Sequence, residues 1–135
     1  MSLPEAWVGK ALILEPKDVN IIILSLGKIA KQNNINILLG GFFIKRKTKI
    51  VSTCYLINNE GEVAGFTDKL FPSMAVGERV FSDFGETLNI LTVDNTRFGV
   101  VVCVDAMYPE IVRKLSLKGA KVIFNPGNIP ENRIK

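Results

Sequence analysis

Residues 98–110 read Phe98-Gly99-Val100-Val101-Val102-Cys103-Val104-Asp105-Ala106-Met107-Tyr108-Pro109-Glu110. The apolar, largely β-branched run that ends at Val102 is typical of a buried strand. Pro109 and Glu110 suit the first turn of a helix, because proline lacks the donor that is unpaired there and a carboxylate complements the helix dipole. A strand, a turn and a helix in this order predict an α/β fold. Cys103 then lies at the rim of a sheet, where such folds keep their chemistry.

The flanking segments continue this alternation of elements. Helices are predicted over residues 16–33 and 109–118, where apolar residues recur at helical spacing. Strands are predicted over residues 35–39, 42–44, 50–57, 63–66, 88–93, 98–103 and 120–125. We expect Gly40-Gly41 to close the first of these strands and residues 58–61 to form a turn. This order predicts a layered α/β domain with a mixed sheet.

Two further segments are predicted to lack regular structure. Residues 67–87 carry six ionisable side chains. Pro72, Gly77 and Gly85 interrupt the segment and disfavour a regular helix or strand. Long loops inside compact domains are often functional, so this loop is a candidate part of the site. The tail that follows Gly127 is predicted to form no helix or strand of its own.

Composition restricts the class of protein. The chain has 135 residues, 47% of them apolar and 22% charged, which is typical of one globular domain. The net charge of +4 comes mostly from scattered lysines. The cluster at residues 45–49 is interpreted as a solvated hairpin tip, since no aromatic residues alternate with it as nucleic-acid stacking would require. No nucleic-acid partner is therefore expected. The apolar runs are only as long as a strand, so no membrane partner is expected either.

Cysteine and histidine usage narrows the chemistry. Cys54 and Cys103 have no paired spacing, which disfavours a disulfide or zinc site and fits a reducing cytoplasm. The chain has no histidine, which excludes Cys-His and Ser-His-Asp machinery and removes the commonest metal ligand. We therefore expect no metal and no cofactor. A reactive Cys103 would need a carboxylate as base and an ammonium to hold negative charge, and Glu5 and Lys69 are the candidates.

Three stretches together resemble one family. They are Leu3-Pro4-Glu5-Ala6-Trp7-Val8-Gly9, Gly61-Glu62-Val63-Ala64-Gly65-Phe66-Thr67-Asp68-Lys69-Leu70-Phe71-Pro72, and the opening stretch over residues 98–110. In order and spacing they are similar to the glutamate, lysine and cysteine segments of the nitrilase, or carbon–nitrogen hydrolase, superfamily. The resemblance implies a mixed-sheet α-β-β-α sandwich. It also implies that residues 1–135 form a single partial domain, incomplete at both ends.

The resemblance also implies roles for particular residues. Cys103 would attack an amide or nitrile carbon, and Glu5 would act as general base for the thiol and later for water. Lys69 and the backbone N–H of Val104 would stabilise the oxyanion. Glu78 would orient the lysine and the substrate. The implied function is hydrolysis of a non-peptide carbon–nitrogen bond in a small molecule, more readily an amide than a nitrile, through a thiol acyl-enzyme.

Other interpretations stay open at this point. A free cysteine at a strand end is ordinarily a small buried hydrophobe, as we expect for Cys54. Asp105 is expected to order the turn at Cys103, here called the elbow, by accepting backbone hydrogen bonds. An inactive fragment that depends on a complementing chain, or on a second copy of itself, is the main alternative. A redox-sensing thiol is disfavoured, because no resolving cysteine lies near Cys103 in the sequence.

Overall fold

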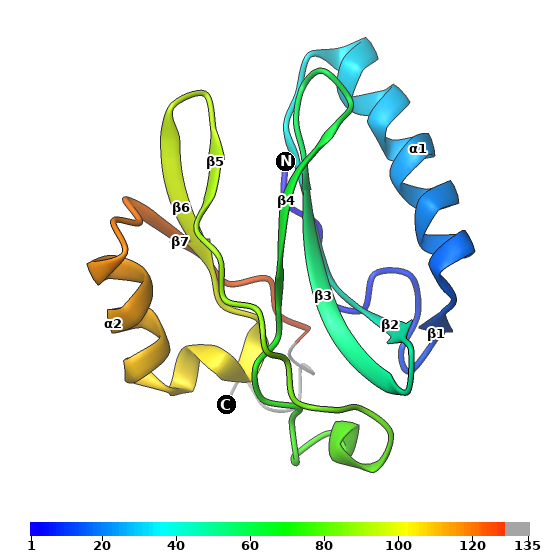
Figure 1. The fold of residues 1–135 in the computed structure, drawn as a ribbon, viewed down its shortest axis with the longest axis vertical. Coiled ribbons are helices and arrows are strands. Elements are labelled where there is room, and N and C mark those ends of the chain that lie inside the picture. Colours follow the sequence, from blue (N-terminus) through cyan, green and yellow to red (C-terminus); the bar gives the residue numbers. More distant parts are fainter. Residues whose placement is uncertain (129–135) are drawn as a thin grey trace.

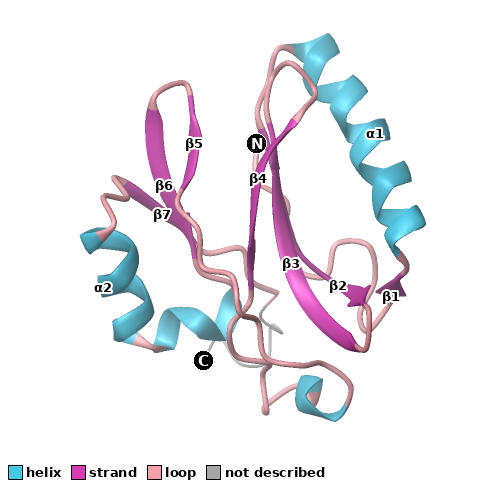
Figure 2. Ribbon diagram, viewed as in Figure 1, coloured by secondary structure: helices cyan, strands magenta, loops and turns pink. Residues whose placement is uncertain are grey.

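The computed structural model describes residues 1–128 and arranges them in four layers. The first part of the chain forms β1 (Ile13–Leu14), α1 (Pro16–Asn33), β2 (Ile37–Arg46), β3 (Lys49–Ile57) and β4 (Val63–Asp68). The second part forms the 3₁₀ helix η1 (Glu78–Val80), β5 (Leu91–Val93), β6 (Thr96–Val100), the 3₁₀ helix η2 (Cys103–Met107), α2 (Pro109–Leu117) and β7 (Val122–Phe124). Two sheets face each other, with α1 outside one and α2 outside the other (Figures 1 and 2). The predicted α-β-β-α sandwich is confirmed.

Both sheets mix parallel and antiparallel pairs, as expected. In the first sheet, with strand order β1-β2-β3-β4, β1 runs parallel to β2 and the other neighbours are antiparallel. In the second sheet, with order β5-β6-β7, β5 is antiparallel and β7 parallel to β6. The parallel pair is connected through η2 and α2, so the opening stretch of sequence is the crossover of a strand–helix–strand unit.

Three apolar clusters hold the layers together, and the strands contribute to them alternately. In β2, Ile37 and Leu39 pack with residues of α1, whereas Leu38 packs between the two sheets. After β6, Val102 joins Val100 between the sheets. The residue between these two valines packs instead with Ile111 and Leu115 of α2. A strand covered on both faces needs apolar side chains on both, which explains the uninterrupted run.

One predicted boundary is wrong for a physical reason. Gly40-Gly41 does not close a strand, because β2 continues through it with a register shift between Leu39 and Phe42. A Cβ atom on Gly40 would lie 2.0 Å from the carbonyl oxygen of Pro4. The glycine therefore admits the N-terminal segment against the strand, and this contact determines where Glu5 lies.

The remaining differences concern strand ends. The helix over 16–33 is confirmed to the residue. β4 continues to Asp68, and only Leu91–Val93 of the strand predicted over 88–93 is formed. β6 ends at Val100, so Cys103 lies in η2 and not in a strand. The prediction for the tail concerns residues 129–135, which lie outside the described residues. Within residues 1–128, no helix has both the length and the apolar character to cross a bilayer.

Candidate active site

Glu5 is held at the edge of the first sheet by backbone contacts. The N–H of Leu3 donates to Leu38 at 2.9 Å, and the N–H of Ala6 donates to Gly41 at 2.7 Å. Both acceptors are carbonyls of β2, so the chain around Glu5 runs beside that strand. The Glu5 residue is only 5% exposed. A buried carboxylate requires a partner, and the fold supplies one.

That partner is Lys69, which directly follows the last residue of β4. Its side chain is buried, and its Nζ donates to Oε1 of Glu5 at 2.6 Å and to both carboxylate oxygens of Glu78 at 2.9 and 2.7 Å. Burial by itself lowers the pKa of Lys69, but the charges and hydrogen bonds of Glu5 and Glu78 outweigh it and raise the pKa above its usual value. The lysine is therefore an ammonium shared by two carboxylates.

Glu78 comes from the loop that was predicted to be functional. It opens η1 after Gly77, whose φ of 75° lies in the left-handed region that glycine tolerates. The backbone N–H of Ser73 donates to Oε2 of Glu78 at 2.6 Å. This bond holds the carboxylate in place, and Nζ of Lys69 donates to both of its oxygens. The residue is only 7% exposed, so its carboxylate is not a surface charge.

Cys103 occupies a strained backbone position at the start of η2. Its φ is 51°, a left-handed conformation that costs a non-glycine residue about 1–2 kcal/mol. Its N–H donates to the carbonyl of Pro126 at 3.1 Å, which ties the elbow to the segment after β7. Strain of this kind is common at functional turns, where the surrounding structure fixes the direction of a side chain.

The surroundings of Cys103 keep its thiol protonated. Burial raises its pKa, and the charge and hydrogen bond of Glu5 raise it further. The Lys69 ammonium and a backbone hydrogen bond from Asn128 act in the opposite direction without cancelling the rise. The thiol therefore has a carboxylate within reach and needs that carboxylate, or another base, to become a thiolate.

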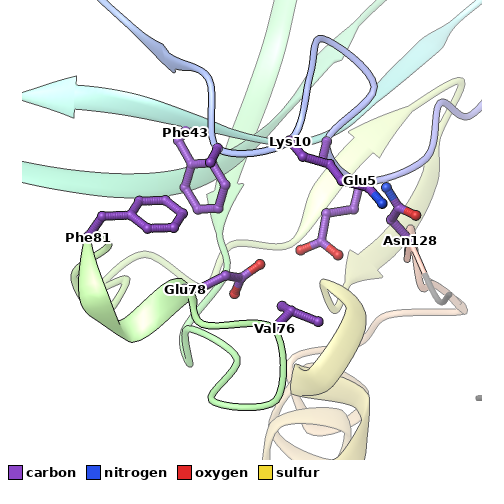
Figure 3. Close-up of a pocket in the computed structure, with 9 residues that line it drawn as sticks. Glu5, Lys10, Phe43, Val76, Glu78, Phe81 and Asn128 are labelled. Carbon is purple, nitrogen blue, oxygen red and sulfur yellow. The ribbon is translucent and has the colours of Figure 1, made fainter.

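A cavity of about 150 Å³ opens in front of these carboxylates. The side chains of Glu5 and Glu78 extend into it from opposite sides (Figure 3). The other residues that line it come from several elements: Ala6, Lys10, Ala11, Phe43, Val76, Phe81 and Asn128. Phe43 and Phe81 form one wall as an edge-to-face pair with ring centroids 4.9 Å apart. Lys69 and Cys103 are not among the lining residues. A molecule that enters the cavity therefore reaches the carboxylates of Glu5 and Glu78 first.

Asp105 has a contact that sequence reasoning missed. It is fully buried, its Oδ2 accepts the N–H of Leu70 at 2.7 Å, and its Oδ1 accepts the N–H of Phe71 at 2.9 Å. Burial raises the pKa of Asp105 to about 6, against the lowering effect of these hydrogen bonds. The expectation that Asp105 accepts backbone hydrogen bonds is correct. They come, however, from the segment that follows Lys69 and not only from its own elbow.

The predicted site residues thus fall into two groups. The structure joins Glu5, Lys69 and Glu78 in one buried cluster, and it places Cys103 in hydrogen-bonding range of Glu5. Val104 follows the cysteine within η2. The role of each remains a prediction. Cys54 is a fully buried core residue, as expected. Within residues 1–128 there is no cluster of acidic, cysteine or histidine side chains suited to a metal ion.

Comparison with known proteins identifies the family. A model of the family described as carbon-nitrogen hydrolase matches residues 1–134. The chain belongs to the carbon–nitrogen hydrolase family. One relative is the 2-oxoglutaramate amidase of Bacillus subtilis (strain 168), 26% identical over 137 residues. The match covers 98% of this chain and 53% of that protein, so the chain spans about half the length of this relative. Nitrilase homolog 2 of Dictyostelium discoideum is 30% identical over 115 residues, which cover 78% of this chain and 35% of that protein.

Solved structures agree with the fold of this carbon–nitrogen hydrolase chain. An amidase from Nesterenkonia sp. superposes with a TM-score of 0.83 at 19% identity, over 98% of this chain and 52% of that one. A carbon-nitrogen hydrolase from Helicobacter pylori G27 superposes with a TM-score of 0.77 at 22% identity, over 84% of this chain and 39% of that one. The resemblance inferred from three short stretches is therefore confirmed, together with the layered fold that it implied.

Proposed function

We propose that this chain carries the reactive groups of an amidase-type hydrolase that cleaves non-peptide carbon–nitrogen bonds through a thiol acyl-enzyme. The observation that carries the proposal is the position of Lys69 between Glu5 and Glu78, with the Cys103 thiol in hydrogen-bonding range of Glu5. A base, a cation and a nucleophile that lie close together can carry out acyl transfer without histidine.

The proposed reaction begins with the protonated thiol. Glu5 accepts the proton of Cys103, and the sulfur attacks the carbonyl carbon of the amide. The resulting oxyanion is stabilised by the Lys69 ammonium and by the N–H of Val104. Glu5 then returns its proton to the departing nitrogen, which leaves as ammonia or an amine and produces a thioester on Cys103. Glu5 finally activates water, whose attack releases the carboxylic acid and restores the thiol.

Glu78 is proposed to orient this cluster. Its two oxygens accept hydrogen bonds from Lys69, and its own position is fixed by the N–H of Ser73. With two carboxylates around one ammonium, the cluster retains a net negative charge when Glu5 is ionised. Transfer of the thiol proton to Glu5 neutralises the cluster and places the negative charge on the sulfur, where the Lys69 ammonium stabilises it.

The proposed substrate is a small amide. A cavity of about 150 Å³ suits a short acyl chain. The related Bacillus protein is named a 2-oxoglutaramate amidase. A variant of the Nesterenkonia amidase carries the acetamide moiety of fluoroacetamide on its active-site cysteine. Both names point to short amides, and the two unpaired cysteines of this chain are compatible with the reducing cytoplasm proposed as its location.

Mass spectrometry of the intact protein after incubation with a panel of short amides tests the proposal. We expect an acyl adduct that maps to Cys103, that is absent from Cys103→Ala and that persists in Cys54→Ala. Release of ammonia should follow the same pattern. A panel that leaves Cys103 unmodified, while the thiol still reacts with iodoacetamide, would contradict the proposal.

A second candidate is a chain that becomes active, or stable, only together with a second copy of itself or a complementing chain. It is favoured by a groove of about 360 Å³ between the two sheets, lined by apolar side chains that include Leu38, Phe98 and Phe124. Val122 and Phe124 of β7 are 47% and 39% exposed. Sedimentation velocity over a range of concentrations tests this candidate. A stable monomer that hydrolyses amides would exclude it.

A further inference from the structure

The elbow that carries Cys103 and the segment that carries Lys69 are joined by one buried side chain. Asp105 lies two residues after Cys103, and the two N–H groups that it binds belong to Leu70 and Phe71, directly after Lys69. The donor–acceptor distances are 2.7 and 2.9 Å, one to each carboxylate oxygen. Charge-assisted hydrogen bonds of this length are stronger than those between neutral groups.

The geometry makes Asp105 a clamp between two parts of the chain that approach the site from different sheets. Lys69 extends from β4 of the first sheet, whereas Cys103 follows β6 of the second. The clamp is supported on one side by the stacked rings of Phe71 and Tyr108, whose centroids are 4.3 Å apart. Two rigid elements joined at two points on one planar group have little freedom to slide past each other.

We propose that Asp105 is a positioning residue that sets the distance between the Lys69 ammonium and the Cys103 sulfur. The proposal rests on the proposed function, because it assigns Asp105 to the same site. Asp105 does not line the cavity, so it acts through the backbone of Leu70 and Phe71 and not on the substrate. An ionised carboxylate suits this task, since it can accept both hydrogen bonds and has no proton that would oppose either donor.

The variant Asp105→Asn tests the clamp while keeping the size of the side chain. An amide can accept from one N–H, but its own NH₂ group then faces the other, so one of the two bonds is lost. Asp83→Asn is the matched control, because Oδ2 of Asp83 likewise accepts a backbone N–H, that of Ile50 at 2.8 Å, within the long loop. Both variants are checked for a cooperative thermal transition.

The first measurement is the pH dependence of iodoacetamide alkylation at Cys103, followed on the Cys103 peptide by mass spectrometry. The Lys69 ammonium lowers the pKa of the thiol, so a displaced lysine should move the midpoint to higher pH in Asp105→Asn. Loss of the Asp105 charge alone would move it to lower pH. An upward shift supports the clamp, whereas a downward shift, no shift, or an equal shift in Asp83→Asn overturns it.

The second measurement is turnover of a short amide. Misplacement of a reacting group by about 1 Å lowers the rate on the order of 10²-fold, so kcat should fall to that extent in Asp105→Asn while KM changes little. Unchanged kcat overturns the clamp. If the wild-type protein shows no turnover at all, the proposed function fails, but the alkylation result still decides whether Asp105 positions Lys69.

A third measurement needs no variant and remains valid if Asp105→Asn does not fold. Amide signals of Leu70, Phe71 and Lys69 are followed by NMR between pH 4.5 and 8. The charged and titratable groups of the site are Glu5, Glu78, Lys69 and Cys103. All three amide signals should shift together with a midpoint near 6, the pKa of Asp105. A midpoint shared by Leu70 and Phe71 but not by Lys69 would overturn a positioning role.

Discussion

Glu5 and Lys69 are separated by 64 positions in the sequence, yet Nζ of the lysine lies 2.6 Å from Oε1 of the glutamate. Both side chains are buried, so neither charge is stabilised by water. Removal of such charges from water is costly unless geometry and additional hydrogen bonds compensate. Glu78 provides that compensation, and the cluster therefore depends on the correct packing of the N-terminal segment, β4 and η1 at one point.

Replacement of Lys69 by methionine should destabilise the protein strongly. Methionine fills a similar volume but leaves Glu5 and Glu78 facing each other without a cation. Removal of one partner of a buried ion pair costs roughly 3–5 kcal/mol. Urea denaturation at pH 7 should show this loss in the free energy of unfolding.

Lys49→Met is the matched control for this measurement. Lys49 also contacts a carboxylate, that of Glu86, but both side chains are largely exposed. Exposed ion pairs contribute little to stability, because water solvates the separated charges almost as well. Equal losses for Lys69→Met and Lys49→Met would mean that burial of the cluster is not what makes it important.

Glu5→Gln should change thiol reactivity and turnover in opposite directions. Burial and then the charge of Glu5 raise the pKa of Cys103, so removal of that charge should lower the pKa and speed alkylation at pH 8. Turnover should nevertheless fall about 10²–10⁴-fold, the usual contribution of a general base. Stopped-flow alkylation and ammonia release measure the two effects. A parallel rise or a parallel fall would contradict the assignment of Glu5 as base.

Much of the fold is predictable because its layers impose periodic patterns. The apolar run from Phe98 to Val102 predicts a strand that is covered on both faces, and the structure confirms it. Pro16 and the helical spacing that follows it predict α1 correctly to its last residue. β1 was not predicted, because a strand of two residues is too short to produce a period.

The site is less accessible to sequence reasoning, because it depends on contacts between distant segments. No periodic pattern predicts that the loop holding Glu78 folds back onto Lys69, and only the family resemblance suggested it. Gly40 looks like the end of a strand, since the sequence does not reveal that Pro4 lies against it. The bonds from Leu70 and Phe71 to Asp105 were likewise missed, because backbone donors leave no trace in residue type.

Asp105 should make the stability of the protein depend on pH in an unusual direction. Its pKa is raised from its ordinary value of 3.8 to about 6, so its contribution to stability is fully present below pH 3.8 and is lost as the pH rises through about 6. The full difference between 3.8 and about 6 corresponds to about 3 kcal/mol, most of which is lost between pH 4 and pH 7. Urea denaturation of wild type and Asp105→Asn at these two pH values measures it. The wild-type advantage should decrease with pH, and an increase would mean that the two N–H bonds outweigh burial.

Gly40→Ala should displace the N-terminal segment. Its new Cβ would lie 2.0 Å from the carbonyl oxygen of Pro4, so the backbone that carries Glu5 must move. Trp7, the only tryptophan, reports this movement because its Nε1 donates to the carbonyl of Gly40 at 3.2 Å. We expect a red-shifted emission and a loss of roughly 1–3 kcal/mol, as for other overpacked sites. Gly77→Ala is the control for the emission alone: a Cβ there meets no atom within 4 Å, but the φ of 75° makes this substitution destabilising by itself. Its emission should be unchanged, and the same red shift in both variants would disprove the steric argument.

Cys103 offers a test of strain that is independent of turnover. At an ordinary position inside a helix or strand, glycine is about 0.5–1 kcal/mol less stable than alanine. At Cys103 the φ of 51° penalises any side chain with a Cβ, so Cys103→Gly should be about 1 kcal/mol more stable than Cys103→Ala. The same pair of substitutions at Cys54, a buried residue of β3 without positive φ, should show the ordinary order. Thermal and urea unfolding of the four variants decide the matter. If glycine is the less stable choice at both cysteines, the elbow is not strained, and the nucleophile is held in place by its neighbours alone.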